Sequence, residues 1–183
     1  MARLPYPDGL PVTPDRRNLG RMFEYLSPNM LLGFRALMKG IRESPLDTGL
    51  RELAILRVGY LHQCQYEMYH HKPSASYVGM SDRNIEALTS PNPADVGQFL
   101  PVELAAIAFV DDMVRQTRPS DASLAKIREF LSPREILDLV CVSGGYTLVC
   151  RLIETTGVEL DSETLSPEGR GPKSVLLAKG KED

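Results

Sequence analysis

Ten neighbouring positions of the chain hold a cysteine, a glutamate and all three of its histidines. The histidines lie between positions 62 and 71, and Cys64 and Glu67 lie among them. Cys64 and Glu67 are three positions apart, and His71 follows Glu67 by four. Side chains at these spacings share one face of an α-helix, so we predict that the three line one pocket. His70 is turned by about 100° from His71 on a helix and should face elsewhere.

Each member of this cluster also has a plain structural interpretation, which the sequence leaves open. Three histidines can cluster by chance. Glu67 and His71 could form a surface pair worth about 0.3 kcal/mol, and Cys64 could be a small buried hydrophobic residue. His62 and Cys64 do not fit a recognised spacing of zinc ligands, so we expect no metal and no cofactor.

A second carboxylate lies one helix earlier in the sequence. Glu52 precedes Cys64 by twelve positions, and it could return to the same pocket if the chain turns near residues 59–63. It could equally be a solvated charge between Arg51 and Arg57. We expect Cys141 and Cys150 to lie in the core, because both occur in an apolar helical stretch.

The elements that must position these residues all have helical periodicity, so the predicted fold class is all-α. Apolar residues recur at helical spacing from about Pro14 to Arg42, with a break before Pro28. Capping residues and glycines bound the following helices. The expected spans are about 47–61, 64–78, 81–88, 101–113, 121–131 and 133–149. We predict an extended arm over residues 1–14, one helical domain over 15–161 and a polar, mobile tail over 162–183.

Composition limits the possible functions. The chain has 183 residues, 43% of them hydrophobic, and a formal charge of −3. This balance offers no basic surface for nucleic acid or an anionic membrane. We expect no membrane span, because no run approaches the ~18 apolar residues that one requires. No secretory signal is recognised, and three cysteines imply no disulfide framework, so we expect a cytoplasmic protein.

Three stretches of sequence together resemble the carboxymuconolactone decarboxylase family, whose superfamily includes the alkylhydroperoxidase D-like proteins. They are Arg51-Glu52-Leu53-Ala54-Ile55-Leu56-Arg57-Val58, then Cys64-x-Tyr66-Glu67-x-x-x-His71 with Gly79-Met80-Ser81, and Tyr146 to Glu159. The resemblance covers roughly residues 15–160. It implies an alkylhydroperoxidase D-like helical bundle that assembles as a homo-oligomer, commonly a trimer or hexamer, and binds a small-molecule substrate.

The resemblance leaves two branches of the family open. Peroxidatic members carry Cys-x-x-Cys-x-x-x-His with a glutamate upstream, which this chain matches at Glu52, Cys64 and His71 but not at Glu67. Decarboxylases resemble it at Glu67 and His71 instead, without the cysteine. A Cys-x-x-Cys peroxidase needs a second sulfur to resolve the sulfenic acid. The glutamate cannot do this, and its charge disfavours a thiolate nearby.

We therefore predict an acid–base enzyme of decarboxylase type that acts on a small carboxylic acid or lactone. Its expected catalytic residues are Glu52, Cys64, Glu67 and His71. The alternatives are a thiol oxidoreductase that uses Cys64 and a non-catalytic binding protein. The candidate residues for holding the substrate are Tyr66, Arg57 and Arg151, each of which could instead have a structural role.

Overall fold

The computed structural model describes residues 1–9, 17–162 and 173–179, and in these residues every regular element is a helix. The predicted all-α class is therefore confirmed. The helices are α1 (Asn18–Met22), a 3-10 turn η1 (Phe23–Tyr25), α2 (Pro28–Glu43), α3 (Thr48–Leu61), α4 (Gln65–Val78), α5 (Asp82–Leu88), α6 (Pro93–Val96), α7 (Pro101–Gln116), α8 (Asp121–Ile127), α9 (Pro133–Thr156) and α10 (Val175–Lys179).

The boundaries follow from capping chemistry. The Asp47 carboxylate accepts hydrogen bonds from the backbone amides at the start of α3, and Ser81 caps α5 in the same way. Ser132 and Glu135 form a reciprocal capping box at the start of α9. Gly79 and Gly157 end α4 and α9 in the left-handed conformation that glycine adopts without strain.

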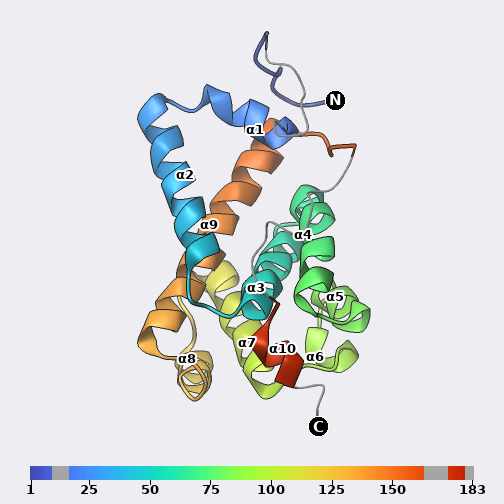
Figure 1. Cartoon of the computed structure of the whole chain (residues 1–183), viewed down its shortest axis with the longest axis vertical. Helices are drawn as coiled ribbons and strands as arrows, with labels where there is room; N and C mark the ends of the chain where they lie inside the picture. Colours follow the sequence, from blue (N-terminus) through green and yellow to red (C-terminus); the bar gives the residue numbers. More distant parts are fainter. Residues whose placement is uncertain (10–16, 163–172, 180–183) are drawn as a thin grey trace.

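Helix α3 lies at the centre of the molecule, against α4, α7 and α9 (Figure 1). Its residues from Thr48 to Gly59 are all buried, so it has no solvent-facing side. Charged residues on this helix must therefore find partners inside the protein. Helix α2 lies outside this group and packs beside α9 (Figure 1).

The contact between α2 and α9 depends on one of two adjacent glycines. A Cβ atom at Gly145 would lie 2.7 Å from Ile41 Cδ1 and 3.1 Å from Met38 Cε, whereas one at Gly144 would meet nothing within 4 Å. Gly145 thus lets α2 approach α9, and this approach brings Met38 and Phe34 to the cavity described below.

Both ends of the described chain pack on the helical domain. In the N-terminal arm, the Arg3 amide donates to the Thr156 carbonyl at 2.8 Å, and residues 10–14 of the predicted arm lie outside the described residues. The sequence did not predict α10. The amides of Val175 and Leu176 donate to the Asp47 carboxylate, which anchors this helix beside α3. Residues 163–172 and 180–183 of the predicted tail lie outside the described residues.

One expectation about α9 needs correction. Cys141 is exposed, because it lies on the outer face of the helix, whereas Cys150 is buried as predicted. By length and composition, α9 is also the one helix among residues 1–9, 17–162 and 173–179 that could cross a membrane. Small and mildly polar residues interrupt the apolar residues of α9, so the sequence shows no unbroken apolar run there. A helix in the core of a globular protein has the same composition.

Candidate active site

A cavity of about 490 Å³ lies between α1, α2, α4 and α9. Its wall combines apolar and aromatic side chains with titratable ones. The lining residues are Arg17, Leu19, Gly20, Phe23, Phe34, Met38, Arg42, Tyr66, Glu67, His70, His71, Tyr146 and Val149. A mostly apolar concavity with a few convergent polar groups is the usual form of a small-molecule site.

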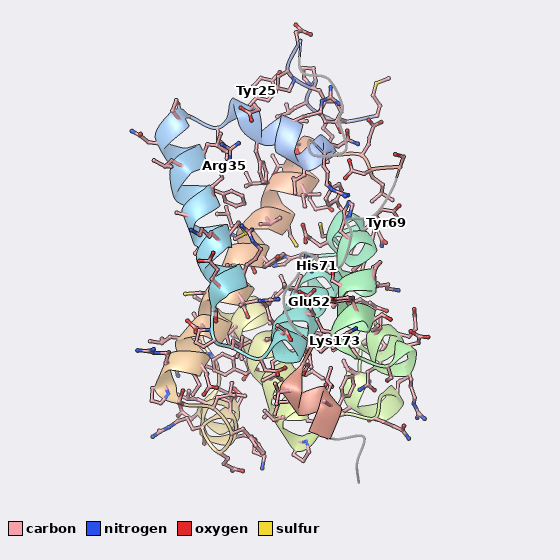
Figure 2. The ribbon with its side chains drawn as sticks, viewed as in Figure 1. Tyr25, Arg35, Glu52, Tyr69, His71 and Lys173 are labelled. Atoms are coloured by element: carbon pink, nitrogen blue, oxygen red, sulfur yellow. The ribbon has the colours of Figure 1, made fainter. Side chains whose placement is uncertain are left out.

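His71 stands between two buried glutamates in the wall of this cavity. Its Nδ1 lies 2.7 Å from Glu52 Oε2, and its Nε2 lies 3.4 Å from Glu67 Oε2. All three side chains are at most 5% exposed. Figure 2 shows Glu52 and His71 close together in the interior, where α3 faces α4. The ring of Tyr146 contacts His71 edge to face, with 5.2 Å between the centroids.

This geometry gives His71 an acceptor on each nitrogen. A carboxylate only accepts hydrogen bonds, so Nδ1–H donates to Glu52. A proton on Nε2 faces Glu67, which lines the cavity together with His71. Arg51 lies beside the other oxygen of Glu52, with 3.7 Å between Nε and Oε1. The arrangement fixes the ring and provides a site for a proton at the cavity wall.

The Cys64 thiol lies near this group but not in the cavity wall. Gln63 adopts a left-handed φ of 56°, and the Cys64 amide donates to the Gly59 carbonyl at 2.8 Å, so the chain turns sharply between α3 and α4. Cys64 is the N-cap of α4 and is fully buried. The predicted helical face therefore brings Glu67 and His71 to the cavity, while Cys64 lies behind it.

The thiol of Cys64 has a second thiol next to it. Cys150 of α9 is 1% exposed. Interaction with the Cys64 thiol, burial, and the nearby charges of Glu67 and Glu154 raise the pKa of the Cys150 thiol far above its usual range. Cys150 is therefore a protonated thiol at neutral pH.

A second polar cluster surrounds His70 on the same cavity. His70 Nε2 lies 3.0 Å from Asp161 Oδ2, and Arg17 Nη1 lies 3.4 Å from His70 Nδ1. Since arginine only donates, His70 Nδ1 accepts and Nε2–H donates. The Tyr66 hydroxyl donates to Asp161 at 2.5 Å, and the Asn18 amide donates to its other oxygen at 2.9 Å. Burial and the bond to Asp161 raise the pKa of Tyr66 well above its usual range.

Sequence reasoning missed several residues of this cluster and of the cavity wall. Arg17 and Asp161 lie at opposite ends of the domain sequence, so no local spacing links them to the histidines. Arg42 and Tyr146 lie on helices that the sequence predicted, but the cavity they share forms only when α2 packs on α9. His70 was expected to face elsewhere. It does have different partners from His71, yet both line one cavity.

The three other candidate residues are in different places. Tyr66 lines the cavity. Arg57 does not: it is fully buried, holds the Asp111 carboxylate through Nε and Nη2, and donates to the carbonyls of Leu88 and Ser90. Arg151 is exposed on α9, where its charge and burial of the ring lower the pKa of His62. The structure does not bring Arg57 or Arg151 into the cavity. Among the described residues, no group of three or more histidine, cysteine, aspartate or glutamate side chains is arranged to hold a metal ion.

Part of the chain that holds these residues is similar to a known family. Residues 28–112, which include Glu52, Cys64, Glu67 and His71, match the model of the carboxymuconolactone decarboxylase family. No curated protein matches the sequence.

Solved structures share the fold. The alkylhydroperoxidase AhpD core of an uncharacterized peroxidase-related protein from Ralstonia eutropha superposes with a TM-score of 0.75 at 17% identity, covering 94% of this chain and 98% of that one. A peroxidase-related protein from Silicibacter gives 0.66 at 19% identity, covering 80% and 75%. A protein of unknown function from Agrobacterium tumefaciens gives 0.66 at 20% identity, covering 75% and 94%. The chain is therefore similar to the carboxymuconolactone decarboxylase family over residues 28–112, and it shares the fold of these alkylhydroperoxidase D-like structures.

Proposed function

We propose that this protein is an acid–base enzyme of decarboxylase type, and that it acts on a small carboxylic acid or lactone. The observation that carries the proposal is the position of His71, which has a glutamate on each ring nitrogen and lies in the wall of a cavity of about 490 Å³. Proton transfer by a positioned histidine typically contributes about 10²–10⁴-fold to a rate.

The reaction needs two events at this wall. When the carbon–carbon bond to the carboxylate breaks, CO₂ leaves and the electron pair is delocalised as an enolate or dienolate. His71 then gives its Nε2 proton to the substrate carbon, and solvent restores that proton by way of Glu67. Glu52 holds Nδ1–H throughout, which keeps the ring in the orientation that presents Nε2 to the cavity.

The cavity wall supports the same substrate class. Phe23, Phe34, Met38 and Val149 offer an apolar surface for the carbon skeleton. Arg42 is also a lining residue, and its guanidinium is the group that we propose pairs with a substrate carboxylate. Arg17 is engaged with Asp161 and His70, so it positions that cluster rather than serving as the first anion site.

The proposal is tested by assaying CO₂ release from carboxymuconolactone and from a panel of β-keto and β,γ-unsaturated acids. We expect one member of the panel to be turned over. Glu67→Gln should lower kcat by at least about tenfold, whereas Glu86→Gln should not change it. Glu86 is a matched control because it is an exposed carboxylate paired with Lys72, away from the cavity. Turnover that survives in Glu67→Gln at the wild-type rate would contradict the proposal.

Two of the similar structures are described as peroxidase-related, which makes hydroperoxide reduction the competing activity. The peroxidatic pattern requires a second cysteine where this chain has Glu67. We propose that peroxide turnover is weak for this reason, since the carboxylate opposes ionisation of a thiol one helical turn away. Iodoacetamide kinetics across pH should show faster alkylation of Cys64 in Glu67→Gln. Rapid catalytic peroxide turnover by the native protein would contradict this choice of branch.

We also propose that the protein is a homo-oligomer. Several large apolar side chains of α2 and α9 are exposed, namely Met30, Leu32, Leu37, Leu137 and Leu148. Exposed large apolar side chains that gather on a surface are typical of an interface that another chain covers. Light scattering at micromolar concentration should give a multiple of the 20.3 kDa chain mass. A monomer mass would contradict this proposal and leave the chemistry of the cavity unaffected.

A further inference from the structure

A second cavity, of about 550 Å³, adjoins the candidate active site. It is formed by the turn between α2 and α3, the start of α3, the turn between α8 and α9, and α10. Arg42 is the one described residue that lines both cavities. Figure 1 shows α10 beside the start of α3, far from α1. The proposed reaction uses only the first cavity and leaves the second without a role.

Most of the surface of this second cavity is apolar. Its interior is lined by the buried side chains of Leu46, Leu50, Val102 and Leu131. Phe130 also lines the cavity and is 39% exposed, so it lies toward the solvent side. A concave apolar wall of this size is suited to the alkyl or aromatic part of a small molecule.

The charged residues of the wall leave an excess of positive charge for a ligand. Three are cations, Arg42, Arg51 and Lys173, and two are carboxylates, Asp47 and Glu135. Asp47 accepts hydrogen bonds from the first amides of α3 and of α10, and Glu135 accepts from the N-cap residue of α9. The positive ends of these helices offset the two carboxylates. A ligand in the cavity therefore gains from carrying a negative charge.

Arg51 is the cation that lies inside the protein. Its side chain is 3% exposed, whereas Arg42 is exposed and the Lys173 ammonium donates to the Tyr77 carbonyl. A guanidinium carries five N–H donors in one plane, so it can serve several acceptors at once. This geometry matches a carboxylate.

Arg51 also connects the second cavity to the acid–base group. Its Nε lies 3.7 Å from Oε1 of Glu52, whose other oxygen lies 2.7 Å from Nδ1 of His71. Its Nη1 donates to the carbonyl of Arg42 at 2.9 Å, near the end of α2. An anion beside Arg51 would share the guanidinium with Glu52 and so change the electrostatic surroundings of His71.

We propose that the second cavity binds a monocarboxylate with an apolar tail, and that the bound carboxylate acts on the Glu52–His71 pair through Arg51. The tail lies against the leucines and Val102, and the carboxylate pairs with the guanidinium. A more highly charged anion is disfavoured by the carboxylates of Asp47 and Glu135 in the same wall. This inference goes beyond the proposed acid–base activity and does not depend on it.

The experiment titrates the isotope-labelled, full-length protein with sodium octanoate and follows it by nuclear magnetic resonance. We expect a saturable shift of the amide signals of Val175 and Leu176, which donate to Asp47 in the cavity wall. The ring signals of His71 should shift with the same saturation curve, and those of His62 should not, because His62 lines neither cavity.

Two further ligands separate the contributions of charge and tail. Acetate keeps the carboxylate without the tail, and 1-octanol keeps the tail without the charge. Each should bind at least about tenfold more weakly than octanoate, since each loses one of the two kinds of contact. Binding of 1-octanol as tight as that of octanoate would contradict the role of Arg51.

Matched variants assign the ligand to one cavity. Val175→Glu and Phe130→Glu each place a negative charge in the second cavity, on different elements, and both positions are partly or mostly exposed. Each should weaken octanoate binding at least about tenfold by like-charge repulsion. Gly20→Glu adds the same charge to the first cavity, at a position where a Cβ meets nothing within 4 Å. It should leave the affinity unchanged.

Three results would overturn the inference. One is the absence of saturable octanoate binding. Another is binding that Gly20→Glu abolishes while Val175→Glu and Phe130→Glu retain it, which would place the ligand in the first cavity. The last is a His71 ring signal that stays fixed while the Val175 amide shifts, which would refute the action through Arg51. His71→Gln should bind octanoate with unchanged affinity, so the result is separable from the acid–base proposal.

Discussion

His70 and His71 are neighbours on α4, yet their surroundings give them opposite chemical characters. His70 lies between the cation Arg17 and the carboxylate Asp161, so one nitrogen accepts and the other donates. His71 lies between the carboxylates of Glu52 and Glu67, so each nitrogen faces an acceptor. The first arrangement satisfies a neutral ring with a fixed tautomer. The second holds Nδ1–H on Glu52 and presents Nε2 to Glu67 at the cavity wall.

The comparison shows that position on the cavity does not by itself identify the catalytic group. Both histidines line the same cavity and both are buried. The two histidines differ in the elements that supply their hydrogen-bonding partners. The partners of His71 come from α4 itself and from the central helix α3, which are held rigidly in the core. Those of His70 come from the start of α1 and the segment after α9. We therefore assign proton transfer to His71 and positioning to His70.

The largest expected effect separates the two histidines by activity. His71→Gln should lower kcat/KM for decarboxylation by about 10²–10⁴-fold, because the proton donor is lost. His70→Gln should lower it by about tenfold or less, with most of the change in KM. Steady-state CO₂ release measures both, and His62→Gln is the matched control because this histidine does not line the cavity. A larger loss in His70→Gln than in His71→Gln would reverse our assignment.

The two glutamates around His71 should differ in their effect on folding. Glu52 is 1% exposed and faces both His71 and the buried Arg51. Removing its charge leaves buried partners uncompensated, so Glu52→Gln should lower the free energy of unfolding by about 3 kcal/mol. Glu67 lies farther from His71 and at the cavity wall, so Glu67→Gln should cost only about 1 kcal/mol. Urea denaturation compares them, and equal losses would contradict the difference in geometry.

The cluster around His70 should affect stability more than catalysis. Asp161 accepts from Tyr66, His70 and the Asn18 amide, so Asp161→Asn should cost about 2 kcal/mol of unfolding free energy. The raised pKa of Tyr66 adds a pH dependence. Its contribution is fully present below the unfolded pKa of about 10 and is lost as pH rises above that value. Tyr66→Phe should abolish this alkaline slope in urea denaturation. A slope that persists unchanged in the variant would assign it to another group.

The smallest expected effect concerns the two glycines of α9. Gly144→Ala should raise the free energy of unfolding by about 1 kcal/mol, since alanine is the better helix former and nothing lies near its Cβ. Gly145→Ala should gain less or lose stability, because its Cβ would press on Ile41 and Met38 of α2. Only the latter should also change activity, through movement of α2 at the cavity. Equal stabilisation by both substitutions would contradict this expectation, because it would show that α2 can move away from the new Cβ atom without a loss of stability.

The sequence predicted the helices well because their signals are local. Asp47, Ser81 and Ser132 cap helices whose starts the sequence predicted. The pairing of Glu67 with His71 could also be predicted, because the two residues share one helical face. Glu52 was placed near them through the family resemblance.

The rest of the site depends on contacts that no local pattern encodes. Asp161 meets His70 only because the chain after α9 passes the N-terminal end of α4. Cys64 shares the helical face of Glu67, but as the N-cap of α4 it lies behind the cavity wall, in contact with α9. The apolar sequence around Arg57 gave no sign that its side chain would be buried on Asp111. Each of these follows from tertiary packing.

The stereochemistry of protonation in D₂O tests the central assignment of His71 most directly. A proton donor fixed on one wall of the cavity delivers its proton to one face of the substrate carbon. Nuclear magnetic resonance of the decarboxylated product should therefore show a single solvent deuteron in one configuration for the native protein and for His70→Gln. Any residual product of His71→Gln should be a mixture of the two configurations, because solvent can then deliver the deuteron to either face. Stereospecific deuteration by His71→Gln at an undiminished rate would contradict the account.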